Sequence, residues 1–500
     1  MKKKIFSIII LTLVLSLLAS CAGGGEVPVT VTAANPGQTA VTEDSARLAF
    51  EGGDSLGPFK VKSDTNIRLM TLIYDPLFTL DSAYNLKGVI AQDCAADLRA
   101  INVTLKTGIN FSDGSPVTTQ DIIYSFNEAK ESFAYSSRLA NFESIVAAND
   151  VNLVVTLRES DPYAANCLTF PIVKKGSNVD RPLGSGRYVL SEESGKYYLT
   201  VNPQKTGFSP SITKFELNEI KNAAVINDSL QIGGTCFNFD DLADGAYQRV
   251  TAATQDIIMN NFVYLGVNSG KEVLANADLR RAISAAINRE EIVTTAYQGH
   301  AKAAQSPFNP NWFVLSGAQN TLLLENSSIE ELIAESKEGL AAEPLRLLVN
   351  SENGYKYEMA KLIKSDLDSV GIPVTIEALA PEDFVTNVRK GDFELYIGEI
   401  HLTDNMNLSE LFYGGNCSYG VTPAAQELSA ERYEQMLEGK CELMDFINVF
   451  ASELPFIPLC YRAGLAIYMN SIDFGNALCS ERDVFLNVEK WKITRDEQTS

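Results

Sequence analysis

The sequence predicts an α/β fold, with a mixed α+β arrangement in the first half of the chain. Hydrophobic residues make up 45% of the 500 residues and charged residues 21%, which is ordinary for a globular protein. Between residues 344 and 400, apolar segments with the period of a strand alternate with segments that have a helical period. Before residue 260, short alternating stretches are mixed with isolated helical segments.

The segment 344–400 shows the most regular pattern. Gly371 and Gly391 each follow a helical segment, at the position where a glycine commonly ends a helix. Strands joined through helices imply a parallel sheet with right-handed crossovers. Ligands of such sheets bind beyond the carboxyl ends of the strands, where we expect loops at 350–354 and 398–405. The expected strands are 345–349, 374–378 and 393–397, and the expected helices are 355–370 and 381–389.

Capping signals predict three further helices. Thr118 and Asp121 have the spacing of a capping box, which predicts a helix over 118–133. Another helix is expected over 278–287, and Asn288 can cap the helix that follows it. Short strands are expected at 46–50, 102–105, 152–157 and 197–201.

The first residues have the features of an export signal. Residues 2–4 are lysines, and residues 5–18 form an apolar run that is too short for a membrane span of about 20 residues. The sequence Leu-Ala-Ser-Cys follows at 18–21 and resembles the lipobox of bacterial lipoproteins. We therefore expect Cys21 to carry a lipid; the alternative is a plain signal peptide cut near Ala19.

This interpretation places the protein outside the cytoplasm. We expect residues 1–20 to be a signal peptide and residues 21–45, rich in Gly, Ala, Val, Thr and Pro, to be a flexible tether. No other segment has 18 consecutive apolar residues. The body would then hang from the outer face of the cytoplasmic membrane, at the cell surface or in the periplasm.

The net charge of the chain limits the classes of molecule that it is expected to bind. The chain has 41 Lys and Arg against 63 Asp and Glu, a formal charge of −22, which argues against nucleic acid because phosphate binding relies on clustered cations. Loss of the three lysines of the signal peptide would leave −25. Such a field weakly favours cationic solutes, such as ligands with a free amine, within the screening length of about 8 Å.

Histidine and cysteine counts limit the possible chemistry. With two histidines, His300 and His401, a multi-histidine metal centre is impossible and most histidine-based catalysis is disfavoured. Seven cysteines follow Cys21, and no pair has CxxC spacing. We interpret them chiefly as small buried hydrophobic residues, although an oxidising compartment permits one or two disulfides and an odd number leaves at least one thiol unpaired.

Several segments, taken in order, resemble the peptide/nickel class of extracellular solute-binding proteins, family 5, which serve ABC importers. The most specific is LKTGINFSDGSPVTTQDI at 105–122, which is similar to the family signature nearly residue for residue. The turn and cap within this segment have a structural role, so they indicate the family and not the ligand site. The other segments are YDPLFTLD at 74–81, GSGRY at 184–188 with Arg where Pro is usual, LGVN at 265–268, LRRAISAAINRE at 279–290 and LPFIPL at 454–459.

The resemblance implies a two-lobed clamshell of the periplasmic-binding-protein type, in the large peptide-binding class. The ligand would lie in the cleft between the lobes, and closure about a hinge would be read by the permease. The implied organisation is lobe I at 46–262 plus 468–500 with a subdomain near 60–185, lobe II at 268–460, and hinge strands near 262–268 and 458–467.

The implied function is binding and delivery. The chain would capture oligopeptides or dipeptides and hand them to an ABC permease and ATPase complex, as a monomer, with no cofactor and no bond broken. The alternative keeps the fold and changes the ligand to a nickel or other metal chelate, or to another small solute. A surface-tethered hydrolase is a remote alternative, because no HExxH, GxSxG or SxxK motif appears with the required partners.

In peptide binders of this family, the loop that follows strand 393–397 supplies a G-W-x-A-D-Y-x-D-P motif whose acid holds the peptide amine. This sequence departs from the motif, because Glu399 stands where Trp is usual and the Asp-Pro pair is missing. Asp404 is the first candidate for the acid and Glu399 the second, against the alternative of exposed loop carboxylates. His401 could contact a ligand carboxylate or a chelated metal; the alternative, which is favoured, is a single loop histidine whose hydrogen bonds are satisfied within the protein. Gly398, Ile400 and Asn407 complete the candidates in this loop.

A second candidate loop follows strand 46–50. Its paired glycines permit close approach of a ligand to the backbone, so the loop is expected to line the cleft. A simple turn is the alternative. The candidate residues are Glu51, Gly53, Asp54 and Ser55.

Overall fold

The structure is a computed structural model of the 500-residue chain. Residues 42–494 form the main unit, and residues 1–41 with 495–500 form a second unit. The predicted signal peptide, the lipidation site Cys21 and most of the predicted tether lie outside the described residues. The described residues are 40–246, 251–316, 328–336, 339–340, 343–413, 427–475 and 479–496.

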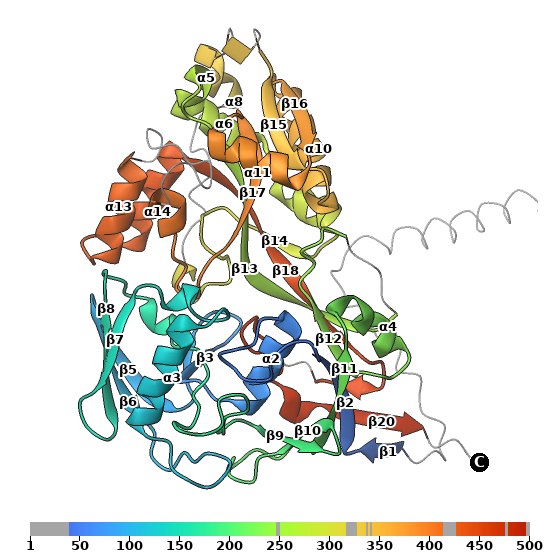
Figure 1. Ribbon diagram of the computed structural model, residues 1–500. Coiled ribbons are helices and arrows are strands. Elements are labelled where there is room, and N and C mark those ends of the chain that lie inside the picture. The colour runs from blue at the N-terminus through green and yellow to red at the C-terminus, as the bar shows by residue number, and fades with distance from the viewer. Residues whose placement is uncertain are drawn as a thin grey trace, which may run out of the picture. The chain divides into compact units, whose positions relative to one another are not determined.

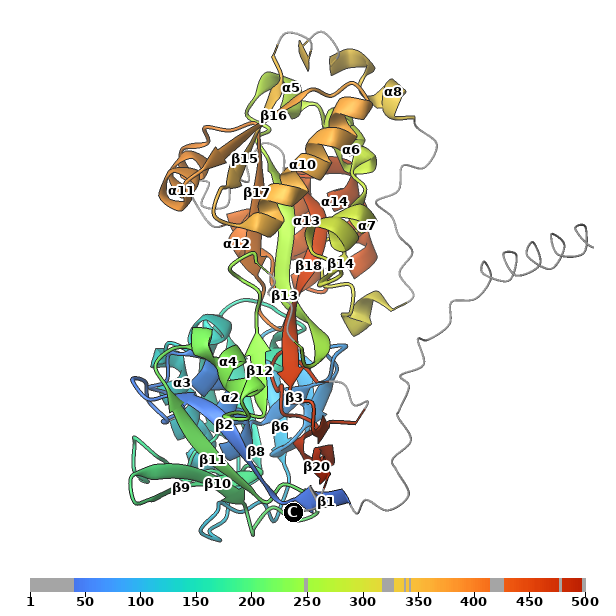
Figure 2. The same ribbon diagram turned by 90° about the vertical axis from the view of Figure 1, so that its right-hand side faces the viewer.

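The largest sheet of the described chain has the strand order β12-β18-β13-β17-β15-β16, with β14 paired to β18. Its centre is the long antiparallel pair β13 and β18, which run side by side in both Figure 1 and Figure 2. Every residue of β18 is buried, as expected for a strand covered on both faces. The bounds are β12 (Phe237–Asp240), β13 (Ala253–Val267), β14 (Ala301–Ala303), β15 (Leu345–Asn350), β16 (Val374–Leu379), β17 (Leu395–His401) and β18 (Phe456–Tyr468).

The parallel part of this sheet confirms the pattern predicted for 344–400. β15 pairs in parallel with β16 and with β17, and the helices α10 (Gly354–Ser369) and α11 (Pro381–Lys390) connect the three strands. Gly371 and Gly391 have φ values of 85° and 70°, so both glycines adopt the left-handed conformation that ends a helix.

The predicted end of the third strand was wrong. β17 continues to His401, whereas the sequence predicted a loop from Gly398. The cause is a tertiary one, since Gly398 to His401 pair antiparallel with Tyr264 to Asn261 of β13. A partner strand more than 130 residues away in the sequence thus extends β17 beyond the point where its apolar run ends.

The first half of the chain forms smaller sheets. One has the order β2-β11-β10-β9 and another β5-β6-β8-β7, and β3 pairs with β4. The strands predicted at 46–50, 102–105, 152–157 and 197–201 are found as β2, β6, β8 and β10. The bounds are β2 (Ser45–Glu51), β3 (Phe78–Leu80), β4 (Leu86–Gly88), β5 (Ala91–Asp97), β6 (Ala100–Leu105), β7 (Phe142–Ala147), β8 (Asn152–Leu157), β9 (Tyr188–Glu193), β10 (Lys196–Val201) and β11 (Lys214–Ile220). Near the chain ends lie β1 (Ala40–Glu43), β19 (Ile472–Asp473) and β20 (Lys492–Asp496).

Helix starts follow the predicted caps. α3 begins after Thr118, whose side chain and that of Asp121 form the predicted capping box. Asn288 caps α7 (Arg289–Glu291), which continues as a short π-helix over Ile292–Ala296. Among the residues that the structure describes, no helix has the length and apolar character needed to cross a bilayer. The other helices are α2 (Asp64–Ile73), α3 (Thr119–Glu131), α4 (Ile226–Gln231), α5 (Glu272–Ala275), α6 (Ala277–Ala286), α8 (Ile329–Leu332), α12 (Ser409–Tyr413), α13 (Glu427–Leu437) and α14 (Leu443–Glu453).

Three large hydrophobic cores stabilise the described chain. The largest joins β13, β15, β17 and β18 to helices α6, α10 and α14. A second joins α2, β2 and β11 to the C-terminal segment through the fully buried Trp491. A third packs α3 against β6, β7 and β8. Burial of each large apolar side chain contributes about 1.5–3 kcal/mol to the stability of the fold. The cores therefore fix the positions of the strand ends and loops that carry the polar groups.

The described cysteines behave as the sequence suggested. All six described cysteines after Cys21 are free thiols, and four of them are buried. Cys417 lies outside the described residues. Burial raises the pKa of the Cys236 thiol to about 12, which keeps it neutral and unreactive.

Candidate functional site

A cavity in the main unit, named here the main cavity, has a volume of about 570 Å³. Residues from α2, from β13 and from the end of β17 line it, together with the C-terminal segment 481–486. Its wall therefore combines segments that are far apart in the sequence. The cationic lining residues are Arg68, Arg138, Arg187, Lys205 and Arg482. The acidic lining residues are Asp64, Asp75, Asp241, Glu410, Glu481 and Asp483.

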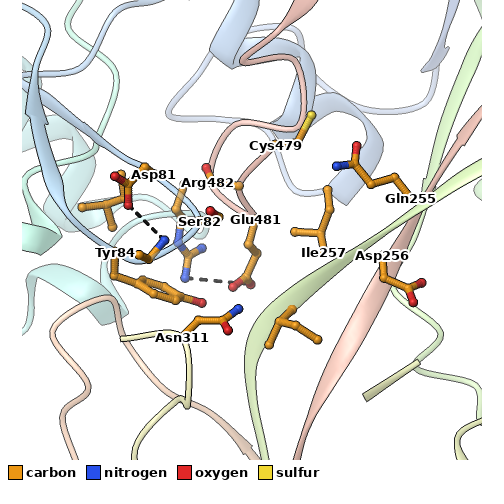
Figure 3. A pocket seen from close by; sticks show the side chains of 14 residues that line it. Asp81, Ser82, Tyr84, Gln255, Asp256, Ile257, Asn311, Cys479, Glu481 and Arg482 are labelled. Carbon is orange, nitrogen blue, oxygen red and sulfur yellow. Dashed lines mark hydrogen bonds and ion pairs between the residues drawn. The ribbon is translucent and has the colours of Figure 1, made fainter. Parts of the chain in front are cut away.

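A second cavity of about 320 Å³ adjoins the main cavity through two shared lining residues, Glu481 and Arg482. Figure 3 shows these two side chains close together, with Tyr84 on one side and Ile257 of β13 on the other. Within the described chain, no cluster of three or more His, Cys, Asp or Glu side chains is placed to hold a metal ion.

Most charges in the wall of the main cavity are already paired. Arg187 Nη2 lies 2.8 Å from Asp483 Oδ2, and Lys205 Nζ lies 2.5 Å from Asp75 Oδ2. The Arg187 pair is structural, because Arg187 also donates to the backbone carbonyls of Phe485 and Thr71 and so joins the C-terminal segment to α2. Arg187 occupies the position where the family segment has Pro, so that departure was a signal in the sequence that pointed to the cavity.

Asp404, the first predicted amine ligand, is fully buried. Its Oδ1 accepts from Arg482 Nε at 2.6 Å, and its Oδ2 accepts from Thr169 Oγ1 at 3.4 Å. It is not among the described lining residues of either cavity. A role in holding a ligand amine stays a prediction, and it would require Arg482 to move away.

Glu399, the second predicted acid, is also occupied. Lys356 Nζ and Arg462 Nε lie 2.9 Å and 3.0 Å from its carboxylate oxygens, and Asn261 Nδ2 donates to it at 2.8 Å. Burial alone would raise the pKa of the Glu399 carboxyl, but the charges of Lys356 and Arg462 and these hydrogen bonds lower it to about 2. Glu399 is therefore ionised at every physiological pH, and its charge is balanced by Lys356 and Arg462 of the same chain.

His401 is the predicted candidate that the structure places in the wall of the main cavity. Its Nε2 lies 2.5 Å from Glu481 Oε1, and the other oxygen of that carboxylate accepts from Asn260 N at 3.0 Å. Burial would raise the pKa of Glu481, but the charges of His401 and Arg482 hold it well below its usual range. His401 thus connects the end of β17 to the segment that separates the two cavities.

The remaining candidates near β17 serve packing and turn formation. A side chain at Gly398 would overlap the rings of Tyr264 and Tyr396, so this glycine permits close strand packing. Ile400 belongs to the largest hydrophobic core. Asn407 Oδ1 accepts from Ser409 N at 2.7 Å at the start of α12.

The segment 51–55 has the contacts of a turn. Glu51 ends β2, and its backbone exchanges hydrogen bonds with the side chain of Asn66 in α2. Asp54 accepts from the backbone N–H groups at 62 and 63, which outweigh burial and lower the pKa of its carboxyl. Ser55 Oγ accepts from Gly57 N, and Gly53 borders open space. None of these residues is among the described lining of the main cavity, so their binding role stays a prediction.

Sequence reasoning missed two arginines in the wall. Arg138 donates from Nη1 to Thr169 Oγ1 at 3.1 Å, and its guanidinium lies 5.2 Å from the ring centre of Tyr135. Arg68 lies 3.9 Å from the ring centre of Phe239. Neither arginine has a carboxylate oxygen within 4.0 Å among the described residues. Arg68 lies in α2, and Arg138 lies in a short 3-10 helix at Ser137–Leu139. Single arginines in such elements have no recognisable spacing, so the sequence offered no signal for them.

Comparison with solved structures defines the class of fold. The periplasmic murein tripeptide-binding protein MppA, in its unliganded open form, aligns with a TM-score of 0.68 at 16% identity and covers 92% of this chain and 99% of its own. NikA from Brucella suis, solved with Fe(III)-EDTA, aligns with a TM-score of 0.65 at 16% identity and covers 89% and 99%. The predicted fold class, an α/β two-lobed periplasmic-binding-protein fold of the large class, is confirmed.

Sequence comparison then gives the family. Residues 86–420 match the model of the bacterial extracellular solute-binding proteins, family 5, and this chain belongs to that family. The oligopeptide-binding protein AppA of Bacillus subtilis is 20% identical over 484 residues, which covers 86% of this chain and 88% of AppA. A relative from Brucella ovis is 24% identical over 286 residues, and that match spans 54% of the relative's length. The suspected resemblance is therefore confirmed at the level of the family.

Proposed function

We propose that this chain is the substrate-binding protein of an ABC importer. It captures a small solute, a short peptide or a metal chelate, in the main cavity and delivers it to the permease. A lipid on Cys21 holds it at the outer face of the cytoplasmic membrane. It acts by binding and handover, without a catalytic step. The observation that supports this most directly is a charged cavity of about 570 Å³ in a chain of the solute-binding family.

The size and the lining of the main cavity support a small ligand. Cavities of about 300–1,000 Å³ are typical of small-molecule sites. Its wall joins α2 and the segment at 133–138 to the end of β17 and to the C-terminal segment, so a bound solute would bridge these elements. Binding of this kind favours the conformation in which the bridged elements are close, which is the physical basis of closure.

Two ligand classes fit this proposal. The relative AppA is named for oligopeptides, and the structural neighbour NikA was solved with a metal chelate. A peptide ligand is the first candidate. The chelate stays a specific second candidate, because His401 lies in the wall of the main cavity and the lining is rich in charged groups.

Native mass spectrometry of the mature protein, followed by calorimetry, tests the proposal. The probes are tri-alanine, a pool of tri- to hexapeptides, and Ni(II) with L-histidine. We expect one of these classes to bind, and Thr79→Trp, which fills the main cavity from β3, to weaken that binding by about tenfold or more. Thr206→Trp on the exposed surface is the matched control and should leave affinity unchanged.

Absence of binding for all three probes would contradict the proposed function. Equal binding by the Thr79→Trp variant, at an unchanged melting temperature, would place the site outside the main cavity. Membrane attachment is tested separately, because Cys21→Ser should release the protein from the membrane fraction without changing its affinity for the solute.

A further inference from the structure

The acid predicted to hold a ligand amine already holds an internal cation. Asp404 has no exposed surface, and its ion pair with Arg482 is 2.6 Å long. Burial would lower the pKa of the Arg482 guanidinium, but the charges of Asp404 and Glu481 hold it above its usual range, so Arg482 stays protonated. An amine that entered this position would have to displace the Arg482 guanidinium from the buried Asp404 carboxylate. Breaking that buried ion pair is energetically unfavourable.

A chain of hydrogen bonds leads from this pair to the main cavity. Arg138 Nη1 donates to Thr169 Oγ1 at 3.1 Å, and Thr169 Oγ1 donates to Asp404 Oδ2 at 3.4 Å. Thr169 has one proton, and Asp404 receives it, so the threonine can only accept from Arg138. Two arginines therefore flank one buried carboxylate. Arg482 donates to Asp404 directly, whereas Arg138 is linked to Asp404 through the hydroxyl of Thr169.

Arg138 is the less compensated of the two missed arginines. Hydrogen bonds to described residues account for one of its five N–H donors. Burial lowers the pKa of both guanidinium groups. Asp64, one helical turn before Arg68 in α2, opposes this at Arg68 together with Glu481 and Asp241, whereas Asp404 is the carboxylate that opposes it at Arg138. A half-buried guanidinium with free donors facing a cavity is suited to a planar anion, because carboxylate oxygens accept its paired N–H groups.

Resting on the proposed function, we infer that Arg138 is a specificity-determining residue that receives a carboxylate of the solute. Asp404, engaged by Arg482, does not receive an amine. The protein would then bind solutes that carry a free carboxylate, and would still bind them when their amine is blocked. This reverses the expectation from the net charge of the chain, which favoured ligands with a free amine.

Two pairs of probes that differ only in the carboxylate test this inference by calorimetry. They are tri-alanine against tri-alanine amide, and Ni(II) with L-histidine against Ni(II) with L-histidinamide. In the class that binds, we expect the acid to bind about tenfold or more tightly than the amide. N-Acetylation of tri-alanine should change affinity by less than about threefold.

Variants separate the two ends of the hydrogen-bond chain. Arg138→Met should bring the acid and the amide to within about twofold of each other, and Arg138→Lys should restore part of the preference. Arg158→Met, which removes an exposed arginine outside the described lining, is the matched control. Asp404→Asn should leave the ratio between free-amine and acetylated peptide unchanged.

The inference is overturned if the wild type binds acid and amide equally, or if acetylation abolishes binding and Asp404→Asn removes that amine preference. Either result leaves the proposed function standing, because a solute is still bound. Failure of every probe to bind removes the proposed function, and the inference with it.

Discussion

Glu399 and Asp404 lie five residues apart and were both predicted as ligand acids, yet their surroundings differ. Glu399 lies in β17 between two cations, Lys356 and Arg462, with Asn261 as a third donor. Asp404 lies in the loop after β17 and has one cation, Arg482, with a threonine hydroxyl as its second partner. Glu399 is thus compensated twice and Asp404 once.

This difference teaches how much each carboxylate depends on a single partner. Breaking a buried ion pair costs most when it leaves a charge with no compensation. Asp404 is completely buried, whereas the side chain of Glu399 keeps 15% of its surface exposed. The surroundings of Asp404 should therefore be the more fragile of the two, and a ligand amine could not exploit Asp404 without the same cost.

The largest expected effect is that of Arg482→Met. This change leaves Asp404 buried and uncompensated, so we expect the free energy of unfolding to fall by about 3–5 kcal/mol. Urea denaturation followed by tryptophan fluorescence measures it. The double variant Arg482→Met with Asp404→Leu should recover most of the loss, because replacing both partners removes the stranded charge. A single variant as stable as the wild type would show that Asp404 does not depend on Arg482.

The next largest effect is the pH dependence of the free energy of unfolding that Glu399 causes. Its pKa is about 2 in the folded chain against an ordinary value of 4.5, so the unfolded chain binds more protons between these two values. Its contribution is complete above pH 4.5 and is lost as the pH falls towards 2. Over that window the wild type should lose about 3 kcal/mol more stability than Glu399→Gln. Urea midpoints at pH 5, 3.5 and 2 provide the measurement, and parallel curves for the two proteins would contradict the assignment.

The smallest of the three is the effect of Lys356→Met. Arg462 and Asn261 remain beside Glu399, so we expect a loss of about 1–2 kcal/mol, well below that of Arg482→Met. Lys361→Met, at an exposed pair in the same helix α10, is the matched control and should change stability by less than about 0.5 kcal/mol. A loss from Lys356→Met as large as that from Arg482→Met would remove the distinction between the two acids.

Local signals were sufficient for much of the fold. The capping box of α3, the glycines after α10 and α11 and the alternation in β8 are set by neighbouring residues, so the sequence predicted them. The end of β17 was not predicted, since its last four residues are strand because β13 lies beside them. Local pattern therefore predicts where elements form, while pairing with distant strands decides how far they extend.

The site was harder to predict for the same reason. The partners of Asp404 are Arg482, 78 residues away, and Thr169, 235 residues away. The local sequence pattern contains no information about contacts between residues so far apart. The family position pointed to Asp404, but it could not show that the acid was occupied. The net charge of −22 likewise describes the whole chain, whereas recognition depends on a few groups such as Arg138.

The most direct test of the account is a crystal structure of the mature protein with a solute identified by calorimetry. We predict the solute in the main cavity, with a carboxylate oxygen at about 2.7–3.2 Å from the guanidinium of Arg138. The pair of Asp404 and Arg482 should be intact in that complex. An amine bound to Asp404, with Arg482 displaced, would contradict the account.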